Sequence, residues 1–142
     1  METQQTIMNY KKSTQIFFSL GVFFILMILD QATKYLTSGV FKNYNFAFSL
    51  PLAGGVMYAL YILAFTGITV YLYKNYYQLG WLEQLAWGLI VTGGVSNVGE
   101  RVILGYVRDW IYIYSGVLNL ADGYIILGMS ILVLHFNRSD KI

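Results

Sequence analysis

The sequence predicts an all-α membrane protein with four transmembrane helices and a small extracytoplasmic β-strand element. Hydrophobic residues make up 57% of the 142 residues and charged residues only 11%, which is less than half of the ~25% that is usual in soluble domains. Several apolar runs are long enough to cross a hydrocarbon core of about 30 Å. The same composition excludes a disordered chain. We therefore expect residues 1–142 to form a single integral membrane domain.

The transmembrane helices are expected at about residues 14–35, 56–73, 81–98 and 118–136. At a rise of 1.5 Å per residue, each helix is long enough to span the bilayer. Aromatic side chains crowd the turn between the second and third spans, as is typical of a membrane interface. These side chains are Tyr71, Tyr73, Tyr76, Tyr77 and Trp81. An even number of spans places both termini on one side.

The basic residues favour cytoplasmic termini, although the asymmetry is small. One side would carry Lys11, Lys12, Lys74, Arg138 and Lys141, and the other side Lys34, Lys42, Arg101 and Arg108. Three bases of the second group have an acid in the same motif, whereas the first group lies mostly free in tails. The positive-inside rule then predicts a cytoplasmic location for both termini.

Several kinds of chemistry are excluded by composition. The chain has no cysteine and one histidine, His135, so thiolate zinc sites, cysteine nucleophiles and Ser-His-Asp triads are excluded. The net charge is +2 and the longest basic block is Lys11–Lys12, which makes a nucleic-acid partner very unfavourable. Catalysis would depend on carboxylates, amides, hydroxyls and a few bases, and we expect neither a metal nor a cofactor.

Four of the seven acidic residues map to the predicted outer side: Asp30, Glu100, Asp109 and Asp122. Acids at membrane depth are costly and usually face a bundle interior or a wet cavity. Asp109 falls in a segment, residues 106–114, whose period-two alternation predicts one β-strand. It shares a face with aliphatic residues, and burial there would raise its pKa. The alternative is a structural acid paired with Arg101 or Arg108.

Asp122 directly precedes an uninterrupted apolar run. Asn119 lies three residues earlier and would share a helix face with it if the helix already begins near Leu118. The alternative is a helix-start acid stabilised by the dipole. A tight turn at Ser115–Gly116 can bring Asp109 and Asp122 together, and two adjacent carboxyl groups share a proton. One could then activate water while the other protonates the departing amine.

Further polar residues accompany these two acids. Asp30 and Lys34 have the i, i+4 spacing of a helix ion pair, which could also simply end the first span. Gly88, Thr92 and Ser96 form a small-residue stripe for helix packing. Asn97 and Arg101, together with Glu100, could orient carboxylates or bind a lipid head group. Residues 42–49 alternate as well and predict a second short strand, whose amide-lined face carries Asn43 and Asn45 and which could pair with an extended peptide.

Taken in order, these motifs resemble the lipoprotein signal peptidase (signal peptidase II) family, a four-span aspartic protease of the bacterial inner membrane. The segments that carry the resemblance are DQATK (30–34), NYNFAFS (43–49), GGVSNVGER (93–101), GYVRDW (105–110) and LNLADGYIILG (118–128). The resemblance implies that Asp109 and Asp122 are the catalytic dyad. It also implies substrate-positioning or structural roles for Asp30, Lys34, Asn43, Asn97, Arg101 and Asn119.

The resemblance further implies a substrate and a location. The substrate would be a prolipoprotein whose cysteine carries diacylglycerol, cut just before that cysteine near the extracytoplasmic face. Three features depart from the family pattern. Asn45 stands where a glycine is usual, Glu100 replaces an aspartate, and the segment between Asp109 and Asp122 is shorter than in other members.

Three alternatives remain at this point. A small proton-coupled transporter would want its key acid inside a span, but the core of the first span, residues 16–29, has none. A Mg²⁺-dependent head-group transferase would want several carboxylates on one element, whereas here they are dispersed. A non-catalytic paralogue of the peptidase would be expected to have lost a dyad aspartate.

Overall fold

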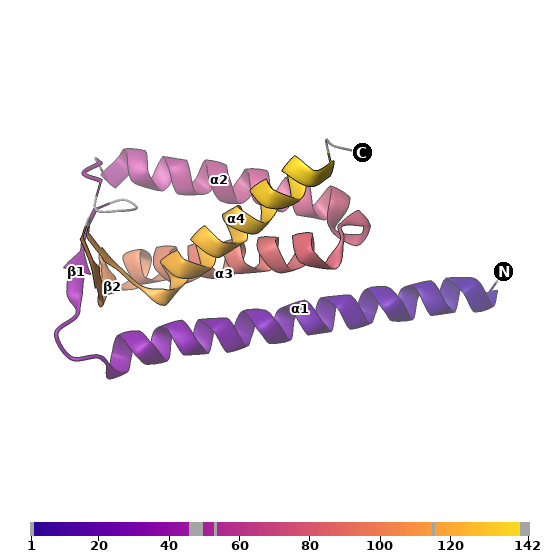
Figure 1. Ribbon diagram of the computed structural model, residues 1–142, viewed down its shortest axis with the longest axis horizontal. Helices are drawn as coiled ribbons and strands as arrows, with labels where there is room; N and C mark the ends of the chain where they lie inside the picture. Colours follow the sequence, from indigo (N-terminus) through magenta and orange to yellow (C-terminus); the bar gives the residue numbers. More distant parts are fainter. Residues whose placement is uncertain (1, 46–49, 53, 115, 140–142) are drawn as a thin grey trace.

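The computed structural model describes residues 2–45, 50–52, 54–114 and 116–139 (Figure 1). Its four long helices are α1 (Glu2–Leu36), α2 (Gly54–Asn75), α3 (Trp81–Leu104) and α4 (Leu120–Ser139). A short 3-10 helix, η2 (Tyr76–Gln78), joins α2 to α3. The predicted four helices are confirmed, and α1 extends well before its predicted span because the polar residues that precede the apolar run continue the same helix.

Three of the helices are long and apolar enough to cross a membrane: residues Ser13–Leu36, Gly54–Gln78 and Leu120–Asn137. The remaining helix, α3, is long enough at about 36 Å but less apolar, because its middle and C-terminal turns carry buried polar side chains. These are Thr92, Ser96, Asn97, Glu100 and Arg101. Polar groups that face the interior of a bundle are the pattern expected when lipid covers the outside.

The distribution of apolar side chains is the reverse of that in a soluble domain. Large apolar groups such as Phe17, Ile28 and Leu63 are each at least 66% exposed. The most buried large side chains include Lys34, Asn119, Asp30 and Asp109. The bilayer therefore acts as the solvent for most of the surface, and the interior near the strands is polar.

Helices α3 and α4 pack at close range through two glycines. A Cβ atom on Gly93 would clash with the carbonyl oxygen of Ala121 and lie 2.8 Å from Ile125. A Cβ atom on Gly128 would lie 2.5 Å from the carbonyl oxygen of Ala86. The predicted stripe of small residues is buried at Thr92 and Ser96, but its Gly88 approaches nothing within 4 Å. The closest approach uses the neighbouring row of α3.

Two short antiparallel strand pairs close one end of the bundle (Figure 1). β1 (Phe41–Asn43) pairs with β2 (Val107–Asp109), with Lys42 opposite Arg108. β3 (Ile111–Ile113) pairs with β4 (Gly116–Leu118), with Ile111 opposite Leu118. The start of α1, the end of α4 and η2 all lie at the opposite end of the molecule. We call the two ends the strand end and the terminal end.

The prediction of one continuous strand over residues 106–114 is wrong. The strand is interrupted at Trp110, whose backbone N–H donates to the carbonyl of Leu118 at 2.9 Å. The chain changes partner there, from β1 to β4, so Asp109 is the last residue of β2. The predicted strand in residues 42–49 is seen through Asn43, and its residues 46–49 lie outside the described residues.

Candidate active site

Asp109 is almost completely buried, at 1% exposure, at the end of β2. Its two carboxyl oxygens accept hydrogen bonds from the side-chain amides of Asn43 at 2.8 Å and Asn119 at 2.6 Å. The predicted alternative of an ion pair is not formed, because Arg101 and Arg108 have other partners. Burial raises the pKa of Asp109, the two amide bonds offset part of that effect, and the charge of Asp122 raises it further.

Asp122 lies in the first turn of α4, where Asn119 is the N-cap residue. The Asp122 N–H donates to Asn119 Oδ1 at 3.0 Å, and the Asn119 N–H donates to Asp122 Oδ2 at 3.1 Å. This reciprocal pair is a capping box with Asp in place of the usual Glu. The helix begins at Leu120, two residues after its approximate predicted start, and the helix-start interpretation of Asp122 describes its backbone setting.

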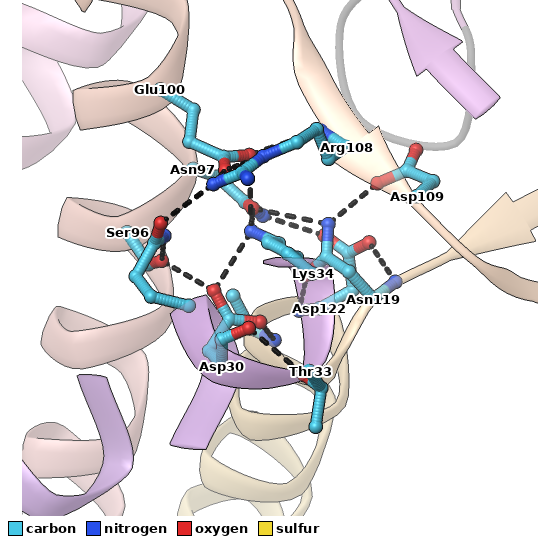
Figure 2. A network of polar contacts seen from close by, with 12 residues as sticks. Asp30, Thr33, Lys34, Ser96, Asn97, Glu100, Arg108, Asp109, Asn119 and Asp122 are labelled. Carbon is cyan, nitrogen blue, oxygen red and sulfur yellow. Dashed lines mark hydrogen bonds and ion pairs between the residues drawn. The ribbon is translucent and has the colours of Figure 1, made fainter. Parts of the chain in front are cut away.

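Two side-chain amides, those of Asn119 and Asn97, join the carboxyl groups of the two aspartates. Asn119 Nδ2 donates to Asp109 Oδ1 and also to Asn97 Oδ1, at 3.1 Å. Asn97 Nδ2 in turn donates to the remaining oxygen of Asp122, Oδ1, at 2.8 Å. Figure 2 shows Asp109, Asn119, Asn97 and Asp122 in one connected network. The strand end of the bundle thus brings the two predicted dyad residues to the same place.

Lys34 lies at the centre of this network and is 1% exposed. Its ammonium group contacts Asp30 at 2.8 Å, Glu100 at 3.3 Å and Asn97 Oδ1 at 3.1 Å (Figure 2). The predicted i, i+4 pair with Asp30 is confirmed. A lysine ammonium has three N–H donors, and each has an acceptor here, as a buried cation requires.

Asp30 connects α1 to both other helices of the site. One of its oxygens accepts from Lys34 and from the Ser96 hydroxyl of α3. The other accepts from the backbone N–H of Ala121, at 2.9 Å, in the first turn of α4. Free N–H groups at a helix start attract carboxylates, so Asp30 caps α4 from a distant part of the chain and fixes the turn that carries Asp122.

Glu100 makes its closest contacts with Arg108, rather than with Arg101, its neighbour in the sequence. It accepts from Arg108 Nη2 at 2.6 Å, from Nε at 2.8 Å and from the backbone N–H at 3.0 Å. Arg108 also donates to Gln31 Oε1 at 2.9 Å. The sequence-based interpretation gave Gln31 no role and considered Arg108 only as a partner of Asp109. Strand alternation was the available signal, since Arg108 must point away from the face that carries Asp109.

Arg101 is 5% exposed and lies over the ring of Tyr61, with 5.8 Å from Cζ to the ring centre. Its Nη2 donates to the carbonyl of Asn45 at 2.7 Å. Its Nε is buried and has no hydrogen-bond partner among the described residues. A buried donor without a partner is costly.

A cavity of about 390 Å³ opens between α2, α3 and α4 beside these residues. Its polar lining is Asn43, Asn97, Arg101, Asp109, Asn119 and Asp122. The rest of its lining is mostly apolar and comes from the helices, including Phe65, Ile68, Ile90, Ile125 and Met129. Small-molecule and peptide sites commonly combine a few convergent polar groups with apolar walls. Within the described ranges, no three His, Cys, Asp or Glu side chains gather as a metal site would require.

Known proteins resemble this chain in sequence and in fold. The family model of signal peptidase (SPase) II matches residues 22–138. The lipoprotein signal peptidase of Helicobacter pylori (strain ATCC 700392 / 26695) is 34% identical, over 87% of this chain and 88% of that one. The lipoprotein signal peptidase of Microcystis aeruginosa (strain NIES-843 / IAM M-2473) is 31% identical, over 76% and 84%.

Solved structures share the fold. A bacterial membrane enzyme solved by the in meso method superposes with a TM-score of 0.73, at 20% identity, over 88% of this chain and 90% of that chain. A second structure of the same description gives a TM-score of 0.68, over 85% and 93%. With the family model covering most of its length, the chain belongs to the signal peptidase II family.

Proposed function

We propose that this membrane peptidase removes the signal peptide from lipid-modified prolipoproteins, with Asp109 and Asp122 as its catalytic dyad. The observation that carries the proposal is that both carboxyl groups line one cavity and are linked through the side-chain amides of Asn119 and Asn97. The curated relatives are lipoprotein signal peptidases by name. The transporter and transferase alternatives have no support from these relatives, and both dyad positions are occupied by aspartate.

The dyad would hydrolyse a peptide bond without a covalent intermediate. One carboxylate takes a proton from water as the water oxygen forms a bond to the scissile carbonyl carbon. The other, protonated, carboxyl group gives its proton to the amide nitrogen as the C–N bond breaks. The proton taken from water replaces the one that is given up, so the pair ends with one shared proton, as it began.

The lining of the cavity suits a substrate that is part peptide and part lipid. The amides at the strand end can bind peptide carbonyls. The outer edge of β1 can pair with an extended peptide. The apolar walls, between α2 and α4, suit acyl chains of the diacylglyceryl cysteine, with cleavage just before that residue.

This proposal includes a topology. In the bacterial cytoplasmic (inner) membrane, the terminal end would face the cytoplasm and the strand end the extracytoplasmic side. The site would then lie at the outer interface, where a secreted precursor still anchored by its lipid can reach it. Residues 1–142 would act as one integral domain.

Purified protein and a synthetic peptide with a diacylglyceryl cysteine test the proposal. We expect cleavage before the cysteine, measured by mass spectrometry, and little or none for the same peptide without lipid. Activity should survive EDTA, because the carboxyl groups themselves activate water. A loss in EDTA that Mg²⁺ or Zn²⁺ restores would contradict the mechanism, and cleavage at another bond would contradict the substrate.

A further inference from the structure

The buried charges around the dyad balance when the cluster holds one additional proton. Among the buried or half-buried side chains at the strand end, the described residues supply four carboxyl groups and three cations. The carboxyl groups are Asp30, Glu100, Asp109 and Asp122, and the cations are Lys34, Arg101 and Arg108. Unpaired buried charge is expensive, so the cluster is neutral when the dyad holds a single proton.

The two dyad members differ in how they contact these cations. Asp122 Oδ1 accepts from Asn97 Nδ2, and the oxygen of that same amide accepts from the ammonium of Lys34. A cation on the carbonyl oxygen polarises an amide and makes its N–H a better donor. Asp109 accepts from the Asn43 amide, which contacts no cation, and from the Asn119 amide. The charge of Lys34 also lowers the pKa of Asp109, but the amide link from Lys34 runs to Asp122.

We infer that Lys34 is a positioning residue that acts through the Asn97 amide to keep the negative charge of the dyad on Asp122 and the proton on Asp109. This inference rests on the proposed function and adds the direction of proton transfer. Asp122 takes a proton from water as the water oxygen bonds to the carbonyl carbon. Asp109 gives its proton to the leaving nitrogen.

Among the described residues, four charged or titratable groups interact with Asp122: Lys34 of α1, Tyr61 of α2, Arg101 of α3 and Asp109 of β2. Asp30 of α1 and Glu100 of α3 contact Lys34. Arg101 acts on Asp122 in the same sense as Lys34. Its contacts are the carbonyls of Asn45 and Asn97 and the ring of Tyr61, so it lies outside the amide link from Lys34.

The pH profile of kcat/KM tests the inference. The fall in rate at low pH (the acid limb) reports protonation of the base, Asp122. The fall at high pH (the alkaline limb) reports loss of the proton that the dyad shares. In the double variant Asp30→Asn/Lys34→Met, one negative and one positive charge disappear, so the net charge of the cluster is unchanged. We expect the acid limb to move to higher pH by about one unit or more, as for loss of a nearby cation. The alkaline limb should move much less.

The single variant Lys34→Met and the control Arg108→Met complete the experiment. Lys34→Met leaves Asp30 and Glu100 short of a partner, so folding is checked by thermal melt and the double variant gives the result if the single one fails to fold. Arg108→Met removes a cation that also contacts Glu100 but has no link to Asn97. It should lower activity while leaving the acid limb in place.

Infrared spectroscopy locates the proton without measuring activity. The C=O stretch of a protonated carboxyl group depends on the hydrogen bonds that group accepts. Asn43→Ala removes a bond to Asp109 only, and Asn97→Ala removes a side-chain bond to Asp122. At neutral pH, Asn43→Ala should shift the band, because the proton lies on Asp109. Asn97→Ala removes the link to Lys34 itself, so part of the proton should move to Asp122 and a second band should appear.

Three results would overturn the inference. These are equal shifts of both limbs in the double variant, a larger shift of the alkaline limb, and an infrared band that responds to Asn97→Ala alone. None of them touches the proposed function, which fails separately if Asp109→Asn or Asp122→Asn still cleaves the lipidated peptide.

Discussion

The surroundings of Asp109 disfavour its ionised form, and this lowers the stability of the folded protein when the carboxyl group loses its proton. Its carboxyl group is buried against two neutral amides, and this raises its pKa above the ordinary value of 3.8. Above pH 3.8 the unfolded chain releases this proton, whereas the folded protein keeps it until the raised pKa is passed. The folded state then binds more protons, and its stability falls as pH rises through that interval.

A prediction follows for the pH dependence of stability. Thermal melts of the wild type should show a midpoint that falls as pH rises through the interval above 3.8, because the Asp109 carboxylate is disfavoured in the fold. Asp109→Asn cannot titrate, so its melting temperature should fall less over the same range. Parallel curves for the two proteins would contradict the burial argument.

The dyad itself is tested by replacement with asparagine, which keeps the volume and removes the acid. Asp109→Asn and Asp122→Asn should each reduce cleavage of a lipidated precursor by at least ~10²–10⁴-fold. Since both groups act as one unit, the double variant should be little worse than either single variant. Cleavage rates are compared with circular dichroism of the same preparations. Near-normal activity in either single variant would refute the mechanism.

Glu100 is a structural acid, and its replacement should have a large effect on stability. It is 5% exposed and contacts both Lys34 and Arg108. Removing one partner of a buried ion pair typically costs about 3–5 kcal/mol, so Glu100→Gln should melt well below the wild type while keeping more activity than the dyad variants.

Glu83→Gln is the matched control, because Glu83 lies in the same helix at the terminal end. Glu83 accepts from the Gly80 N–H and lies 4.0 Å from His135. Weakening a helix cap of this kind costs about 1 kcal/mol. Equal melting temperatures for the two variants would show that the Glu100 network contributes little.

The first turn of α4 is stabilised by local residues and by one residue from a distant part of the chain. The sequence Asn119–Asp122 closes a local capping box, and Asp30 of α1 adds a third acceptor for the first turn. The local pair can be recognised from the spacing of the two residues. The contribution of Asp30 cannot, because it depends on where α1 ends relative to α4, and that is fixed by packing.

The close contact of α3 with α4 predicts the effect of a glycine substitution in α3. Gly93→Ala should destabilise the protein by about 1–3 kcal/mol, as overpacking usually does. It should also lower cleavage, since the added methyl group meets the Ala121 carbonyl and Ile125, next to Asp122. Gly99→Ala is the control in the same helix, where a Cβ atom meets nothing within 4 Å. Alanine there should stabilise the helix by about 0.5–1 kcal/mol. Equal effects at the two positions would contradict the packing.

Across the whole molecule, apolar runs were sufficient to predict the helices but not the strands. A period-two pattern identifies an extended segment without naming its partner, so the switch at Trp110 from β1 to β4 could not be anticipated. The gathering of the predicted site residues at one place could be anticipated, because buried polar groups in a membrane chain are few and tend to cluster. Gln31 was missed because an amide beside an ion pair carries no distinct signal in the sequence.

The arrangement of the whole chain leads to a last prediction, about topology. The start of α1, η2 and the end of α4 lie at the terminal end, and the strands lie at the other (Figure 1). The proposed dyad lies with the strands, at the end of β2 and in the first turn of α4. Reporter fusions at Asn75 and after the last residue should therefore read cytoplasmic, whereas one at Gly39, beside β1, should read extracytoplasmic. Gly39 suits an insertion because it lies in the connection between α1 and β1, outside both elements. The reverse pattern would place the dyad on the cytoplasmic side, where a precursor already anchored by its lipid on the outer leaflet cannot reach it. Fusions reporting Gly39 and Asn75 on the same side would contradict the path of α2 across the membrane.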